Sequence, residues 1–203
     1  MMKILFVNAC MRGDDSRTLR LCNAFLNRLK ERIAEPKIIV HDLRAMGLKS
    51  VDQSVLDMKE PLCDQQAWEH PLFAPALDFQ TADVVVIGAP YWDMSFPSVL
   101  KVWVENMYVR NLTFRYDEDQ PVGLCCGKES VYITTAGSPI GDNDWGTGYM
   151  RAVLQTLGIP GFTRISAEAL DLSRSNPDAI MAAALHEVCR EADALAARIS
   201  ACR

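Results

Sequence analysis

Three short segments of this sequence carry residues suited to binding chemistry, and the first suits a phosphate. Hydroxyl and guanidinium groups alternate at Ser16, Arg17 and Thr18, just where an apolar helical pattern begins. The free N–H groups at a helix N-terminus favour an anion, and hydroxyls and cations add further donors. We therefore predict a phosphate-binding loop over residues 9–18. A simple helix cap formed by Asp15 or Ser16 is the alternative.

The glycine content of this loop excludes the common nucleotide motifs. Only Gly13 is present where a GxGxxG fingerprint needs three glycines, and no GK[ST] sequence follows it. Asp14 and Asp15 would repel a phosphate, whereas Arg12 and Arg17 would offset that repulsion.

The other two segments suit a flat aromatic ligand. Residues 89–97 place three aromatic side chains and a methionine directly after an apolar run. Such side chains can stack on a planar ligand, and a hydrophobic plug over the sheet is the alternative. Residues 134–138 offer small side chains and backbone donors, which allow a ligand ring to approach closely.

Each of the three segments follows an apolar run that predicts a β-strand. Strands are expected at residues 3–8, 37–42, 83–88, 130–135 and 163–167. Helical patterns alternate with them, which is typical of a doubly wound α/β fold with a five-stranded parallel sheet and helices on both faces. The carboxyl ends of the central strands meet at one edge in this fold, so the three segments should converge on one site.

The other elements that the sequence predicts fit a single domain over residues 1–203. Pro61, Pro71 and Pro75 interrupt the stretch before Asp83, which predicts irregular turns with a short helix at its end. A small hairpin is expected from residues 113–116 and 122–125. Helices are expected from Ser16 to about Pro36, from Pro97 through Met107, up to Leu157, and from about Pro177 onward.

Composition excludes several classes of partner. The net charge is −5, with 21 basic residues spread along the chain, so the basic patch that nucleic acid needs is missing. The longest apolar runs are far shorter than the ~20 residues that span a bilayer. No signal-peptide pattern follows Lys3, so we expect a cytoplasmic protein without a membrane partner.

The cysteines and histidines suggest no metal site. Seven cysteines lack zinc-type spacing and are expected to be free thiols, the adjacent Cys125 and Cys126 included. His41, His70 and His186 lie far apart in the sequence and outside the three segments, so they are expected at the surface with no role.

The order of several motifs resembles one family. The run APxWxxSxPxxLKxWxE spans residues 89–105, TFRY spans 113–116, and GK at 127–128 leads into ITTAG at 133–137. This arrangement is similar to the flavodoxin-like NAD(P)H-dependent FMN oxidoreductases, which include FMN-dependent NADH azoreductases and quinone reductases. The resemblance covers essentially the whole chain. It implies a flavodoxin-like fold with strand order 2-1-3-4-5.

The resemblance also implies where FMN would bind. Ser16, Arg17 and Thr18 would hold the phosphate, with Cys10 where the family commonly has serine, and Tyr116 would lie near the nicotinamide or the acceptor. The residues expected around the flavin ring are Pro90, Tyr91, Trp92, Asp93 and Met94 on one side, and Thr135, Ala136, Gly137 and Ser138 at its pyrimidine.

Three departures from the family pattern concern the acceptor pocket. Asp93 stands where azoreductases usually carry asparagine, Met94 where they carry phenylalanine, and residues 155–156 are Gln-Thr in place of glycine and an aromatic residue. Asp93 has two interpretations. Its carboxylate either faces the flavin ring or caps the helix that starts after residues 95–97.

The resemblance implies an enzyme in which NADH or NADPH reduces FMN, and FMN then reduces a quinone or azo compound by a ping-pong mechanism. No catalytic acid or base is obligatory. The alternatives are a non-enzymatic FMN-binding electron carrier and a binding module without flavin. The resemblance also implies a homodimer, and the helix with Trp103, Met107 and Tyr108 supports it because it is apolar around more of its circumference than a surface helix needs. Tyr116 or residues 144–157 of one copy should then cover the other copy's flavin.

Overall fold

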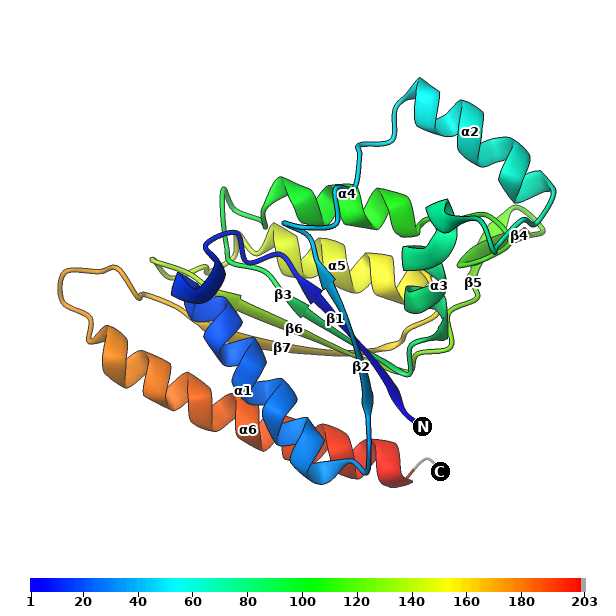
Figure 1. Cartoon of the computed structure of the whole chain (residues 1–203). Helices are drawn as coiled ribbons and strands as arrows, with labels where there is room; N and C mark the ends of the chain where they lie inside the picture. Colours follow the sequence, from blue (N-terminus) through cyan, green and yellow to red (C-terminus); the bar gives the residue numbers. More distant parts are fainter. Residues whose placement is uncertain (202–203) are drawn as a thin grey trace.

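The computed structural model describes residues 1–201 and is built around a parallel sheet (Figure 1). The strands lie side by side in the order β2-β1-β3-β6-β7. Because β4 and β5 form a separate hairpin, this is the predicted order when the parallel strands are counted alone. The strands of the sheet are β1 (Lys3–Asn8), β2 (Lys37–Asp42), β3 (Val84–Gly88), β6 (Glu129–Thr135) and β7 (Gly161–Ala167).

Apolar side chains on both faces of the sheet form two core layers. Every residue of β3 is buried, as expected for a central parallel strand covered on both sides. Leu5 and Val85 belong to one layer, whereas Ile4 and Val84 belong to the other. The alternation follows from the two-residue period of a strand, so the helices must cover both faces.

Two long helices cover one face. α1 (Arg17–Arg32) and α6 (Pro177–Ala201) lie side by side there (Figure 1). The side chain of Ser16 caps α1, which confirms the predicted start of that helix. Arg28 of α1 binds Asp193 of α6 through two nitrogens, at 2.8 and 2.9 Å. No helix among residues 1–201 combines the length and apolarity needed to cross a bilayer.

Three helices cover the other face: α3 (Ala74–Thr81), α4 (Ser98–Met107) and α5 (Trp145–Thr156). α3 is the short helix predicted before Asp83. Trp103 and Met107 of α4 are fully buried in the core layer beneath. Their apolarity is therefore explained by the core and does not indicate a dimer interface.

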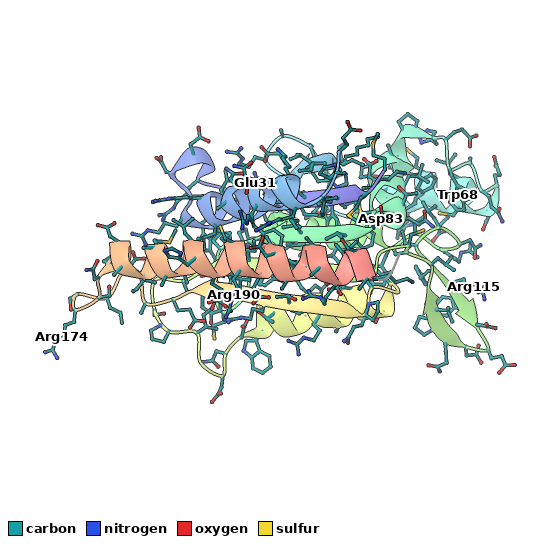
Figure 2. The ribbon with its side chains drawn as sticks, turned by 90° about the horizontal axis from the view of Figure 1, so that it is seen from below. Glu31, Trp68, Asp83, Arg115, Arg174 and Arg190 are labelled. Atoms are coloured by element: carbon teal, nitrogen blue, oxygen red, sulfur yellow. The ribbon has the colours of Figure 1, made fainter. Side chains whose placement is uncertain are left out.

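The predicted hairpin is present, with its strands shifted by one or two residues. β4 (Phe114–Asp117) and β5 (Gln120–Gly123) pair antiparallel, and they lie at the end of the molecule where the parallel strands begin (Figure 1). Figure 2 shows Arg115 of β4 and Arg174, in the loop before α6, at opposite ends of the molecule. The loops after the strands and the hairpin are thus separated by the length of the sheet.

The prediction of irregular turns is wrong for α2 (Gln53–Asp64), a helix of 12 residues. Its N-terminus is capped by Asp52, which accepts the N–H of Val55 at 3.0 Å, and Pro61 lies within its last turn. Val55 and Cys63 are the buried residues of α2. Two buried positions make no apolar stripe, so the sequence pattern did not reveal this helix.

The prediction of a surface position is wrong for His41. The side chain lies on β2 and is 3% exposed. Its Nδ1 accepts the indole N–H of Trp103 at 3.1 Å, and its Nε2 lies 3.3 Å from Asp78 Oδ2. Burial lowers the pKa of His41, although Asp78 acts in the opposite direction. The ring is therefore neutral at neutral pH and joins the sheet to α3 and α4.

Candidate ligand-binding site

The three predicted segments meet at the carboxyl edge of the sheet, where they surround a polar cavity of about 290 Å³. Eight of the residues expected to contact the ligand line it. These are Ser16, Arg17, Thr18, Pro90, Tyr91, Trp92, Thr135 and Gly137. Met11, Arg12 and Asp15 of the first segment also line the cavity. Asp171 lines it as well, but the sequence did not predict this residue as part of the site.

The first segment brings the N-terminus of α1 to the cavity. A short 3-10 turn, Gly13–Asp15, leads into Ser16, whose Oγ accepts the N–H of Leu19 at 3.2 Å. The helix-cap alternative is therefore confirmed for Ser16. The cap uses the oxygen of the hydroxyl and leaves its proton available to donate to an anion. Capping and anion binding are thus compatible at this residue.

A buried hydrogen bond links the first segment to the third. Thr18 Oγ1 and Thr135 Oγ1 lie 2.7 Å apart, and Thr18 is fully buried. The two hydroxyls therefore join α1 to the end of β6 at the floor of the cavity. The hydroxyl of Thr18 already has Thr135 as a partner, so a ligand that contacts it would have to share this hydroxyl with Thr135.

Asp171 supplies an acidic wall that the sequence did not predict. Its Oδ1 binds Arg17 Nη1 at 2.7 Å, and both side chains are exposed. It comes from the loop after β7, next to β6, and contacts Gly137 so closely that a Cβ at that glycine would lie 2.5 Å from Asp171 Oδ2. Its position after a predicted strand was the signal available, but nothing in the sequence showed that this loop folds over the third segment.

The second segment lines the cavity with its first residues and then turns away. Tyr91 donates its N–H to Thr135 O at 2.9 Å and its hydroxyl to Asn143 O at 3.1 Å. Trp92 and Ser95 are bridged by two backbone hydrogen bonds around a tight turn. Asp93 and Met94 form the turn, both at positive φ and both exposed, and neither lines the cavity.

The helix-cap interpretation of Asp93 is wrong. The N-cap residue of α4 is Pro97, and no side chain caps this helix. Asp93 instead occupies a turn position with φ of 50°, a conformation that aspartate adopts more readily than most residues.

Three other residues that were predicted to contact the ligand, in the third segment and in the first, do not line the cavity. Ala136 is buried and donates its N–H to Ala167 O, whereas Ser138 is exposed beyond the cavity. Cys10 is fully buried and its Sγ lies 3.6 Å from Gly88 O. Contact with the Cys22 thiol lowers the pKa of Cys10, while burial raises the pKa of Cys22.

The cysteines with described structure are free, as predicted. Cys125 is buried and Cys126 is exposed, so this adjacent pair forms no disulfide. Cys202 lies outside the described residues.

Tyr116 lies apart from the cavity of its own chain. It is 64% exposed and belongs to β4, in the hairpin at the end of the molecule where the parallel strands begin (Figure 1), whereas the cavity lies where they end. Within one chain, the structure therefore does not bring Tyr116 to the other predicted site residues.

A second and larger cavity, of about 720 Å³, lies near the hairpin among α2, α4 and α5. Its walls are mainly apolar, and the sequence did not predict it. Lys59 of α2 reaches its edge and donates to Tyr108 O at 2.9 Å, and burial lowers the pKa of Lys59. Its apolar lining includes Leu56, Val104, Phe114 and Val153.

Comparison with known proteins identifies the family. The family model described as flavodoxin-like fold matches residues 2–191. FMN-dependent NADH:quinone oxidoreductase 2 of Clostridium acetobutylicum is 31% identical over 187 residues, covering 89% of this chain and 93% of that protein. The FMN-dependent NADH:quinone oxidoreductase of Herminiimonas arsenicoxydans is 33% identical over 181 residues, covering 84% and 88% respectively.

A solved structure agrees in fold over nearly the whole chain. The FMN-dependent NADH-azoreductase of Bacillus anthracis, in complex with FMN, has a TM-score of 0.86 and 25% identity and covers 97% of this chain and 100% of that one. The resemblance inferred from the motifs is therefore confirmed. This chain belongs to the flavodoxin-like family of NAD(P)H-dependent FMN oxidoreductases that includes the quinone reductases and azoreductases.

Proposed function

We propose that this chain is an FMN-dependent oxidoreductase that uses NADH or NADPH to reduce a quinone, azo or similar aromatic compound by a ping-pong mechanism. The observation that carries the proposal is the polar cavity at the carboxyl edge, where the three segments meet in a chain whose relatives are named FMN-dependent NADH:quinone oxidoreductases. The family match over residues 2–191 supports a single domain over 1–203. The free thiols are consistent with a cytoplasmic protein.

The side chains of the cavity fit FMN. The N-terminus of α1 and two guanidinium groups favour a phosphate, and the hydroxyl of Ser16 retains a proton to donate. Tyr91 and Trp92 offer flat surfaces for a ring, and Gly137 lines the cavity with backbone alone. The Asp171 carboxylate occupies the position where a side chain at residue 137 would start. The phosphate is assigned to Arg12, Ser16, Arg17 and Thr18.

Two carboxylates that line the cavity, Asp15 and Asp171, oppose the phosphate, and the contact between Asp171 and Arg17 is weak enough to be displaced. Arg17 is paired with Asp171, with side-chain exposures of 45% and 66%. An exposed ion pair of this kind contributes about 0–1 kcal/mol. Charge-assisted hydrogen bonds from Arg17 and Ser16 to a phosphate are stronger, so Arg17 should exchange Asp171 for the ligand.

The residues of this cavity would hold FMN, which would supply the hydride and electron transfer between the nicotinamide and the acceptor, so no acidic or basic side chain is obligatory. The protein orients the ring and stabilises charge. Tyr91 is fixed by Thr135 and Asn143 and so forms a rigid wall. The amide of Ala136 is already bonded and Ser138 lies beyond the cavity, which leaves the amide of Gly137 to stabilise negative charge at the pyrimidine.

We further propose a homodimer in which each chain completes the acceptor pocket of the other. Tyr116 belongs to the hairpin, at the end of the parallel strands opposite the cavity of its own chain, so it is assigned to the partner's cavity. On the side of α4 and α5 away from the sheet, Trp145 is 65% exposed and lines a shallow apolar cavity with Phe96 and Tyr149. An apolar patch of this kind is typical of an association surface. α5 also falls within the segment predicted to cover the partner's flavin.

The visible spectrum of the purified protein tests the proposed function. A yellow protein that NADH or NADPH bleaches without oxygen is the expected result. A protein that neither contains nor takes up FMN would refute the proposal, and a yellow protein that both nicotinamides leave oxidised would favour the electron carrier. Initial rates with NADH and benzoquinone should give parallel double-reciprocal lines, and intersecting lines would exclude the ping-pong mechanism.

A further inference from the structure

The guanidinium group of Arg164 on β7 holds two carboxylates in place. Its Nη2 donates to Glu168 Oε1 at 2.8 Å. Its Nε lies 2.8 Å from Asp144 Oδ2 as an ion pair, without the geometry of a hydrogen bond. Nη1 donates to Ser166 Oγ at 2.8 Å, and that hydroxyl lies 2.9 Å from Glu168 Oε1. Arg164 is therefore the centre of a network that joins β7 to Asp144, which precedes this strand in the sequence, and to Glu168, which follows it.

The two carboxylates fix the loop of residues 136–144, which follows β6. Glu168 Oε2 accepts the N–H of Ile140 at 2.8 Å. Asp144, at the end of the loop, caps α5 by accepting the N–H of Thr147 at 3.0 Å. The middle and the end of the loop thus depend on side chains that Arg164 positions.

This loop shapes the candidate flavin site. Gly137 lines the cavity directly. The carbonyl of Asn143 accepts the hydroxyl of Tyr91, which lines the cavity from the second segment. A displacement of residues 136–144 would therefore move two walls of the cavity together.

The network is partly shielded from water, so its two carboxylates depend on the guanidinium group of Arg164 to compensate their charge. The side chains of Arg164, Asp144 and Glu168 are 27%, 22% and 28% exposed. Burial opposes ionisation of Glu168, but hydrogen bonds from Ile140 N–H, Arg164 and Ser166 together lower its pKa. Without Arg164, two partly buried carboxylates would lose the cation they share. Backbone hydrogen bonds would still hold residues 136 and 137, but the side chains that fix the middle and the end of the loop would lose their partner.

We propose that Arg164 is a positioning residue for the flavin ring: it orders residues 136–144 before the flavin arrives. The inference rests on the proposed function. A loop that is already ordered loses little conformational entropy when a ligand binds. If the flavin itself had to order the loop, its affinity should fall about tenfold. The loss should be the same for FMN and riboflavin, because the loop is assigned to the ring and not to the phosphate.

Two variants separate this role from a contribution to stability alone. Arg164→Met keeps the apolar stem and removes every polar contact of the guanidinium. Arg198→Met is the matched control, because Arg198 makes a two-nitrogen ion pair with Glu129 at 3.1 and 3.2 Å, at the start of β6 and away from the cavity. Titration of the apo protein with FMN and with riboflavin, followed by flavin fluorescence, gives the dissociation constants. Hydrogen exchange at amides 137–143 reports the order of the loop without any flavin.

We expect Arg164→Met to raise both dissociation constants by the same factor, about tenfold, and to speed exchange in the loop, while Arg198→Met changes neither. Wild-type flavin affinity in Arg164→Met, or an equal loss in Arg198→Met, would overturn the proposal. A wild-type protein that binds no flavin would refute the proposed function instead, and loop exchange would still test the role of Arg164.

If Arg164→Met does not fold, Glu168→Gln tests the same link. The amide oxygen can still accept the N–H of Ile140, but the ion pair with Arg164 is lost. Both flavins should bind more weakly than to the wild type, by equal factors, and the loop should exchange faster. Unchanged affinity and exchange in Glu168→Gln would overturn the proposal.

Discussion

Substitutions of Ser16 separate the two roles assigned to its hydroxyl. The oxygen accepts the N–H of Leu19 at 3.2 Å and caps α1, and the proton is assigned to the phosphate of FMN. Ser16→Ala removes the cap, which costs about 1 kcal/mol of stability, and also removes one hydrogen bond to a charged ligand. Ser16→Asp keeps a good capping group but places a negative charge against the phosphate.

The expected losses differ between the two flavins. A hydrogen bond to a charged group contributes about 1.5–3 kcal/mol, so Ser16→Ala should weaken FMN binding by about 10- to 150-fold. Riboflavin has no phosphate, and its affinity should not change. In Ser16→Asp, two unit charges about 4 Å apart repel by about 4 kcal/mol at an effective dielectric constant near 20. FMN binding should then be lost while riboflavin binding remains.

Titration of the apo protein with each flavin measures these affinities, and thermal unfolding without flavin measures the effect of the cap. Asp52→Ala is the matched control, because it removes the side-chain cap of α2, a helix that does not line the cavity. It should lower stability by about 1 kcal/mol and leave both flavin affinities unchanged. Equal losses for FMN and riboflavin in Ser16→Ala, or tight FMN binding by Ser16→Asp, would refute the phosphate assignment.

Four other side chains give shorter predictions. Burial lowers the pKa of His41, so acid protonates the unfolded chain first. Below pH ~6.5, urea titrations should show stability falling by up to about 1.4 kcal/mol per pH unit until the native pKa is reached, and His41→Gln should flatten this slope. Asp93 is exposed and turned away from the cavity, and a water-screened carboxylate even as near as about 6 Å would contribute only about 0.7 kcal/mol, so Asp93→Asn should raise the flavin midpoint potential by at most about 15 mV in spectroelectrochemistry. Trp145→Glu should halve the mass measured by light scattering, because it charges the exposed apolar surface beside α5. Asp171→Asn should strengthen FMN binding about two- to fivefold and leave riboflavin unchanged, because it frees Arg17 from an exposed ion pair. An unchanged pH slope in His41→Gln would contradict the first argument, and a lowered potential in Asp93→Asn the second. An unchanged mass in Trp145→Glu would contradict the third, and weaker FMN binding in Asp171→Asn the fourth.

The sheet could be predicted because its strands are continuous apolar runs, which need no knowledge of tertiary contacts. β3 is buried along its whole length, and α1 begins at a serine that is typical of a helix cap. α2 could not be predicted in the same way, because it packs through only a few side chains and contains Pro61. His41 looked like a surface residue because its partners, Trp103 and Asp78, come from distant parts of the chain.

The candidate site could be predicted as a set of loops but not as a set of side-chain directions. Parallel strands end at one edge, so the fold alone brings Ser16, Tyr91 and Thr135 together. Whether a loop residue faces the ligand depends on turn geometry. The positive φ angles of Asp93 and Met94 carry both side chains away from the cavity, and nothing in the sequence alone indicated that turn.

The positions of the polar cavity and of the larger apolar cavity link the proposed homodimer to the proposed acceptor site. The polar cavity lies at the carboxyl edge of the sheet, and the larger apolar one lies at the opposite end, beside the hairpin that carries Tyr116. A twofold axis that crosses α4 and α5 at right angles would reverse the second copy, so its hairpin end would face the first copy's flavin. In the proposed homodimer one chain would supply the cofactor site and the other would supply apolar surface for an aromatic acceptor. A variant that stays monomeric should therefore keep FMN bound but lose most of its quinone reduction.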